Sequence, residues 1–160
     1  MDEPKSLAQT DGFQRGDPQA PMPHRVMRPQ TFLAFDFGLK RTGVASGNSL
    51  TRTASPQATI AAEGVARFAL IQARIQEWQP DALVVGIPFH PDGASHDNTV
   101  RAQKFARQLR GRFRLHVFEV DERYSTTEAL ACGAKDADAA SACIILEQFL
   151  RSLPHEQSGP

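Results

Sequence analysis

Apolar residues along the chain form short continuous runs and helical repeats, separated by polar segments rich in glycine and proline. The runs at 32–37 ("FLAFDF") and 81–88 ("DALVVGIP") predict buried strands, because they are short and turn-forming residues follow them. Three further segments predict strands: 42–46, 51–59 and 114–123. Apolar side chains recur every three or four positions in three other segments, which predicts amphipathic helices: 63–78, 98–110 and 136–153.

The order of these elements predicts how they assemble. Three strands come first, and a helix, a strand, a second helix and a fifth strand follow. Two helices end the series, a short one opened by the capping box Ser125–Glu128 and the long one opened by Asp136 or Asp138. Strands joined by turns form an antiparallel meander, and strands joined through helices pair in parallel. We therefore expect one α/β domain over 31–153, with a mixed five-stranded sheet flanked by helices.

Composition adds limits to this picture. Residues 1–30 hold five of the eleven prolines, so we expect a disordered extension there, with Met1, Met22 or Met27 as the start, and a loose tail over 154–160. The 18 basic and 18 acidic residues balance, so net charge neither favours nor excludes nucleic acid. Two cysteines without metal-ligand spacing favour reduced thiols and a cytoplasmic protein. No signal-peptide pattern and no run of the roughly 20 apolar residues of a membrane span occurs.

Carboxylates stand at three informative places. Asp36 ends the first strand, and an aspartate opens the long last helix. Three acids crowd the end of the fifth strand: Glu119, Asp121 and Glu122. Each place has an ordinary explanation, namely a turn, a solvated cluster and a helix N-cap. Together, however, three carboxylates from distant segments form a hard oxygen site suited to Mg²⁺ or Mn²⁺. Two such ions about 4 Å apart support phosphodiester hydrolysis.

Basic residues supply the second signal. Segment 101–116 carries six cations and no acid, while Ala102, Phe105 and Leu109 share an apolar face of the predicted helix. A face of one sign in a neutral protein is typical of a phosphate-backbone contact, although a solvated face is the ordinary alternative. Cations near the carboxylates could bind a strand or neutralise the acids. The candidate nucleic-acid-binding residues are Lys40, Arg41, Arg101, Lys104, Arg107 and Arg123. The histidines and aspartates of "HPDGASHD" fit a structural or substrate-facing loop better than a metal site.

Four ordered motifs resemble the YqgF/RuvX family of bacterial RNase H-like proteins. They are "FLAFDFGLKRTGVASG", "ALVVGIPFHPDG" with "RAQKFARQL", "DERYSTTEA" and "DADAASACIILE". Members are described as Holliday junction resolvases and as nucleases that mature the 5′ end of pre-16S rRNA. The resemblance implies an RNase H-like fold and a metal-binding catalytic triad at Asp36, Glu122 and Asp138, and so selects Glu122 among the neighbouring acids. The segment 130–137 is shorter than is usual in the family, and the N-terminal extension has no assigned counterpart.

Three classes of function follow. The leading hypothesis is a divalent-metal nuclease of the two-metal type that processes pre-16S rRNA, with Holliday junction cleavage by a two-fold homodimer as the alternative. A second class is a non-catalytic RNA-binding factor in ribosome assembly. A third is a phosphate-binding fragment of actin-like ATPases, which disagrees with the length because that fold clamps nucleotide between two such domains.

Overall fold

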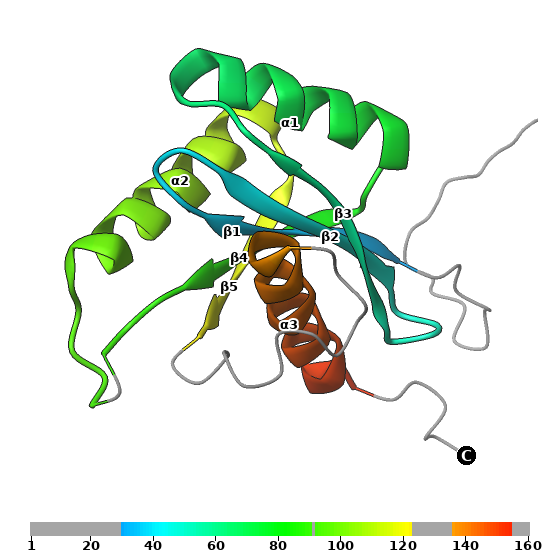
Figure 1. Cartoon of the computed structure of the whole chain (residues 1–160). Helices are drawn as coiled ribbons and strands as arrows, with labels where there is room; N and C mark the ends of the chain where they lie inside the picture. Colours follow the sequence, from blue (N-terminus) through cyan, green and yellow to red (C-terminus); the bar gives the residue numbers. More distant parts are fainter. Residues whose placement is uncertain (1–29, 91, 123–135, 155–160) are drawn as a thin grey trace, which may run out of the picture.

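The computed structural model describes residues 30–90, 92–122 and 136–154 (Figure 1). Within these residues the elements occur in the predicted order. They are β1 (Thr31–Phe37), β2 (Thr42–Asn48), β3 (Ala54–Ile60), α1 (Gly64–Trp78), β4 (Ala82–Ile87), α2 (Asp97–Phe113), β5 (His116–Asp121) and α3 (Ala137–Ser152). The predicted capping box at 125–128, Cys132 and both terminal segments lie outside the described residues. No described helix has the length and apolar character that a membrane span requires.

The five strands form one mixed sheet in the order β3-β2-β1-β4-β5. The pairs β1–β2 and β2–β3 are antiparallel, while β1–β4 and β4–β5 are parallel. This arrangement confirms the meander followed by two helical crossovers. The register places Asp36 of β1 opposite Gly43 of β2, and Phe35 beside Val85 of β4. The end of β1 therefore lies at the centre of the sheet, with a neighbouring strand on each side.

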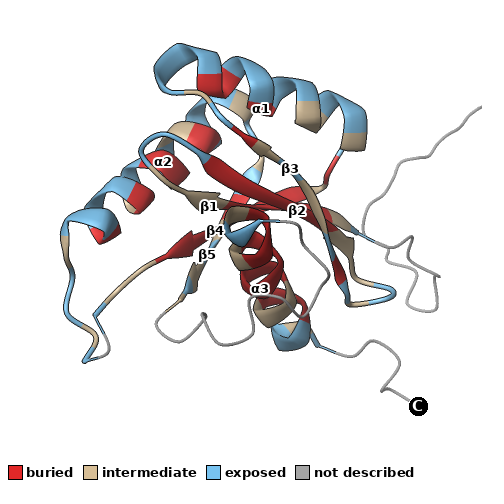
Figure 2. Ribbon diagram, viewed as in Figure 1, coloured by how far each residue is buried: buried red, intermediate tan, exposed pale blue. Residues whose placement is uncertain are grey.

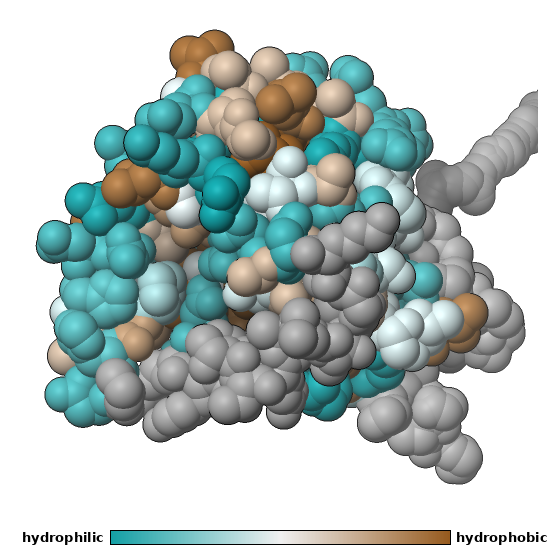
Figure 3. Space-filling view, in the orientation of Figure 1, coloured by the Kyte–Doolittle hydropathy of each residue, from teal (hydrophilic) through white to brown (hydrophobic). Residues whose placement is uncertain are grey.

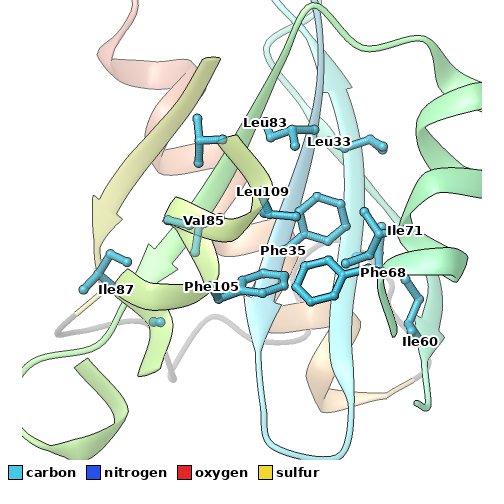
Figure 4. Packing of buried hydrophobic residues seen from close by; sticks show 14 residues of the cluster. Leu33, Phe35, Ile60, Phe68, Ile71, Leu83, Val85, Ile87, Phe105 and Leu109 are labelled. Carbon is cyan, nitrogen blue, oxygen red and sulfur yellow. The ribbon is translucent and has the colours of Figure 1, made fainter. Parts of the chain in front are cut away.

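Side chains of the sheet alternate between two cores. Leu33 and Phe35 face α1 and α2, where they pack with Phe68, Phe105 and other apolar residues (Figure 4). Phe32 and Ala34 belong to the other core, against α3. Figure 1 shows the same layers, with α3 across one face of the sheet and the other two helices across the opposite face. Because both faces of the sheet are covered, successive residues of the central strands are buried, as are the sheet-facing sides of the helices (Figure 2).

Two predicted boundaries were wrong. Helix α2 does not end before Gly111 but continues to Phe113, which packs against the core of α1 and α2. A glycine inside a helix costs only about 1 kcal/mol, which burial of an aromatic ring offsets. The helix ends instead at Arg114, whose left-handed backbone (φ 56°) lets its N–H donate to the Arg110 carbonyl. Strand β3 begins at Ala54 rather than Thr51, because the Asn48 side chain accepts hydrogen bonds from the backbone of Leu50 and Thr51 and holds a turn.

Helix α3 lies very close to the sheet, as its small residues predicted. Ala139, Ala140 and Ala142 are buried in this contact. A Cβ atom at Gly43 would overlap the backbone carbonyl of Asp138, so only glycine allows β2 to approach the first turn of the helix. At the other end of α3, the Arg52 guanidinium donates to the carbonyls of Leu150, Leu153 and Pro154. Both ends of the helix are therefore fixed to the β2–β3 side of the sheet.

Candidate active site

The three predicted carboxylates come from three separate elements. Asp36 continues the Phe32–Ala34 series of β1 and so faces α3. Glu122 follows β5, and its backbone N–H donates to the Ile87 carbonyl at 3.0 Å, which extends the strand pairing to this residue. Asp138 lies in the first turn of α3. The fold therefore directs all three toward one end of the sheet, on its α3 side.

Asp36 and Glu122 are joined by a side-chain hydrogen bond. Burial, opposed by this hydrogen bond and reinforced by the charge of Asp138, raises the pKa of Asp36 to about 6. Burial, then the charge of Asp36, then the hydrogen bond between them raise the pKa of Glu122 to about 8. Both pKa values are raised because two like charges are costly to hold side by side in this buried position. At neutral pH the pair therefore holds one proton.

Two glycines give this pair its space. Gly43 is the antiparallel partner of Asp36, and Gly86 follows Val85 on the other neighbouring strand. A Cβ atom at Gly86 would lie 2.8 Å from Oε1 of Glu122 and would overlap the Ile145 side chain of α3. The floor beneath the carboxylates is thus bare backbone on both sides of β1. The Ser141 hydroxyl of α3 also hydrogen-bonds Asp36 and lowers its pKa.

Asp138 has a different partner. Its Oδ2 accepts a hydrogen bond from Nε of Arg41 at 2.8 Å. Asp136, not Asp138, is the N-cap of α3, since its side chain accepts from the Ala139 N–H at 2.8 Å. The Thr59 hydroxyl donates to the same Asp136 carboxylate at 3.1 Å and ties the cap to β3. Asp138 therefore does not cap the helix, and its carboxylate pairs with Arg41 instead.

A buried arginine that the sequence did not single out holds the β1–β2 turn. Arg67 of α1 is 4% exposed, and burial lowers its pKa. Its guanidinium lies 4.4 Å from the centre of the Phe37 ring and donates to the Ala62 and Leu39 carbonyls. Because Leu39 precedes Lys40 and Arg41, this contact fixes the backbone that carries both predicted cations. An amphipathic pattern alone assigns such an arginine to solvent.

The predicted nucleic-acid-binding residues divide between two elements. Lys40 and Arg41 are exposed on the β1–β2 turn, and Arg101, Lys104 and Arg107 are exposed on α2, along whose edge Figure 3 shows hydrophilic surface. Arg101 and Lys104 line a hollow of about 340 Å³ together with Leu39, which directly precedes Lys40 on the turn. Arg107 lies farther along the helix, and Arg123 lies outside the described residues.

Other cations of α2 are engaged within the protein. Nη2 of Arg110 pairs with Oε2 of Glu119 at 3.0 Å, and the Arg112 guanidinium lies 4.2 Å from the centre of the Phe68 ring. The engagement of Glu119 also separates it from Glu122, which faces the opposite side of β5. The basic segment is therefore only partly available to a ligand.

The loop between β4 and α2 has a structural role. His96 caps α2, with its Nδ1 accepting from the Asn98 N–H at 3.2 Å, and Oδ1 of Asp92 accepts from the Ala94 N–H at 2.9 Å. Among the described residues, no group of three or more His, Cys, Asp or Glu side chains is arranged to hold a metal ion. At the carboxylate site, Asp36 and Glu122 contact each other while Asp138 turns to Arg41.

Comparisons with known proteins agree with this architecture. The chain is 80% identical over 135 residues to a protein of Polaromonas sp. named "Putative pre-16S rRNA nuclease", with 84% of this chain and 98% of that protein covered. A protein of Albidiferax ferrireducens with the same name is 64% identical over 153 residues, covering 85% and 98%.

Two solved structures share the fold at low identity. T. thermophilus RuvC in complex with a Holliday junction substrate aligns with a TM-score of 0.50 at 16% identity, over 81% of this chain and 96% of that one. The fowlpox virus resolvase, solved with Holliday junction DNA, aligns with a TM-score of 0.51 at 12% identity, over 76% and 99%. The fold is RNase H-like, as expected. The model of the RuvX family, described as Holliday junction resolvase, matches residues 30–152, and the chain therefore belongs to this family.

Proposed function

We propose that this chain is a divalent-metal-dependent nuclease that hydrolyses phosphodiester bonds of structured nucleic acid, and that precursor 16S rRNA is its substrate. Membership of a nuclease family supports phosphodiester hydrolysis, and the relatives' names support the RNA substrate. The observation that carries the proposal is the buried Asp36–Glu122 pair with Asp138 beside it. Two carboxylates with raised pKa values, with a third carboxylate from another distant element beside them, are typical of active sites.

The donor set fits a hard divalent cation. Where no cation neutralises two neighbouring buried carboxylates, the pair keeps a proton that the two groups share. Asp36 and Glu122 would hold the metal in place of that proton, and Asp138 would complete the ligand set. When bound, Mg²⁺ or Mn²⁺ would supply Lewis-acid stabilisation of the charge that develops on the phosphate oxygens, with a second ion in the two-metal case. Ser141 would keep Asp36 oriented through its hydrogen bond.

The exposed cations would hold the nucleic acid. Arg41 contacts Asp138 and Lys40 precedes it on the turn, while Arg101 and Lys104 line a hollow on the α1–α2 side that Leu39 of the same turn also lines. Contacts of this kind neutralise phosphates without reading bases, which suits recognition by shape. We also propose that Arg107, exposed on α2, and Arg123, which lies outside the described residues, contact nucleic acid.

Holliday junction cleavage is the second candidate, favoured by the family's description and by the junction-bound structures that share the fold. This activity would require two active sites related by a two-fold axis, and therefore a homodimer. A non-catalytic RNA-binding factor would use the same basic surface, and chelation of metal would leave its RNA affinity unchanged.

Cleavage by wild type and Asp36→Asn on two substrates tests the proposal. The substrates are a 16S precursor leader RNA and a four-way DNA junction, each with Mg²⁺, Mn²⁺ or EDTA. We expect metal-dependent cutting of the RNA by wild type and by the control Glu77→Gln, whose carboxylate is exposed on α1, and none by Asp36→Asn. Cutting of the junction alone would select the second candidate. A folded Asp36→Asn variant that still cuts would refute the assignment.

A further inference from the structure

Arg41 contacts a carboxylate that the proposed metal site requires. Its Nε lies 2.8 Å from Oδ2 of Asp138, and the two side chains are 64% and 30% exposed. From this contact we propose that Arg41 is an exchangeable counter-ion. It holds Asp138 while the site carries no metal, and it is released to a phosphate of the nucleic acid when a divalent cation takes the carboxylate. This inference rests on the proposed function and adds a regulation of the same site.

Both partners of the contact stand on fixed backbone. The turn that carries Arg41 is held through the Leu39 carbonyl by Arg67, and the β1–β2 pairing resumes at Thr42. Asp138 stands on the first turn of α3, where Gly43 touches its carbonyl and Asp136 caps the helix. The contact can therefore be made and broken by side-chain rotation alone, without movement of the sheet or the helix.

Electrostatics favour displacement of Arg41 from Asp138 by the metal ion. An exposed ion pair is weak because solvent screens it, so a hard divalent cation can displace the guanidinium from the carboxylate. A metal ion beside Asp138 would also repel the positive charge of Arg41. The displaced guanidinium is planar and pairs well with phosphate oxygens, more specifically than lysine does. Metal binding would thus prepare the turn to receive the substrate backbone.

This arrangement couples two ligands that bind different groups. Metal would increase the affinity for nucleic acid by releasing Arg41, and nucleic acid would increase the affinity for metal by the same factor. A cation that served only as a surface contact would bind phosphate equally well with and without metal. Variants of Arg41 and Asp138 distinguish the exchangeable counter-ion from the simple surface contact, because the two predict different RNA and metal affinities.

The first experiment needs no metal and no cleavage. Binding of a fluorescein-labelled leader RNA is measured in EDTA for wild type, Asp138→Asn, Arg41→Gln and the double variant. Asp138→Asn should free Arg41 and tighten RNA binding by roughly fivefold or more. The double variant should show no gain over Arg41→Gln alone. An equal gain from Asp138→Asn in the absence of Arg41 would mean simple loss of a repelling charge and would overturn the proposal.

The second experiment measures Mn²⁺ affinity by calorimetry without nucleic acid. Arg41→Gln should tighten Mn²⁺ binding by roughly fivefold or more because the competitor is gone. Lys40→Gln removes the same charge from the neighbouring exposed position, and solvent screening should limit its effect to less than about twofold. Equal effects of the two variants would overturn the counter-ion role and leave the nuclease proposal standing. Failure of wild type and Arg41→Gln to bind Mn²⁺ would overturn both.

Discussion

The proton shared by Asp36 and Glu122 should make the stability of the metal-free protein depend on pH. The pKa of Glu122 rises from 4.5 to about 8 on folding, chiefly through burial. Between these values the folded protein keeps a proton that the unfolded chain has lost. The free energy of unfolding therefore falls as pH rises through this window, by about 1.4 kcal/mol for each pH unit. Glu122→Gln tests this reasoning, because glutamine is neutral at every pH and can still donate a hydrogen bond to Asp36.

The size of the effect follows from the two pKa values. From pH 6.5 to pH 8, wild type should lose on the order of 2 kcal/mol of stability, and Glu122→Gln should remain nearly flat. Asp36, with its pKa raised to about 6, contributes to the decline mainly below this range and in both proteins. The stability present at acidic pH is thus lost toward alkaline pH, which is the sign expected for acids whose pKa is raised by folding.

Urea denaturation followed by far-ultraviolet circular dichroism provides the assay. Both proteins are measured in EDTA at intervals from pH 5.5 to pH 8.5. They carry the same histidines, so the titration of those residues cancels in the difference between the two profiles. Parallel profiles, or a wild type whose stability is constant above pH 6.5, would refute the shared proton and with it the electrostatic description of the site.

Three further substitutions test how the site is held. Gly43→Ala should destabilise the protein by about 3 kcal/mol or more, since the new methyl group overlaps the Asp138 carbonyl; an unchanged melting temperature would contradict the close approach of α3. Arg67→Ala should cost about 2 kcal/mol or more and weaken RNA binding, because the Leu39 carbonyl loses its donor and the turn loosens. A fluorescence binding titration measures this, with Arg74→Ala on the same helix as the control. Arg52→Ala should cost about 1–2 kcal/mol in urea denaturation without changing RNA affinity, since it unties only the C-terminal end of α3.

Local patterns were sufficient to predict the strands, the three long helices and their order. Short apolar runs and helical repeats depend on neighbours in the sequence, so they can be recognised without the fold. The same pattern narrowed the N-cap of the last long helix to Asp136 or Asp138, and the hydrogen bond from the Ala139 N–H to Asp136 decides between them. Strict alternation along β5 puts Glu122 on the same face as Phe118 and Val120, which pack against the α3-side core. It could not choose between the two faces, because both carry apolar residues, and the choice became clear only where α3 packs and Arg110 engages Glu119.

Other features of the site depend on contacts between distant residues. Gly86 is required by Ile145 and Glu122, which come from elements far along the chain, and a glycine in an apolar run gives no sign of this. The helical pattern does not tell whether Arg67 is exposed or buried, because its burial depends on the position of the β1–β2 turn. The end of α2 was misplaced for the same reason, since a core contact of Phe113 outweighs the local preference of glycine.

The core between the sheet and α3 requires a helix that is made after all the described strands, and this has a consequence for the nascent chain. Every described strand emerges from the ribosome before α3, yet α3 supplies Asp138 and packs across one face of the sheet. Until that helix docks, Phe32 and Ala34 have no cover and Asp36 lacks two of its neighbours. Folding of that face and assembly of the carboxylate site are therefore a single late event. The proposed nuclease activity would therefore begin only after α3 has been made and has docked on the sheet.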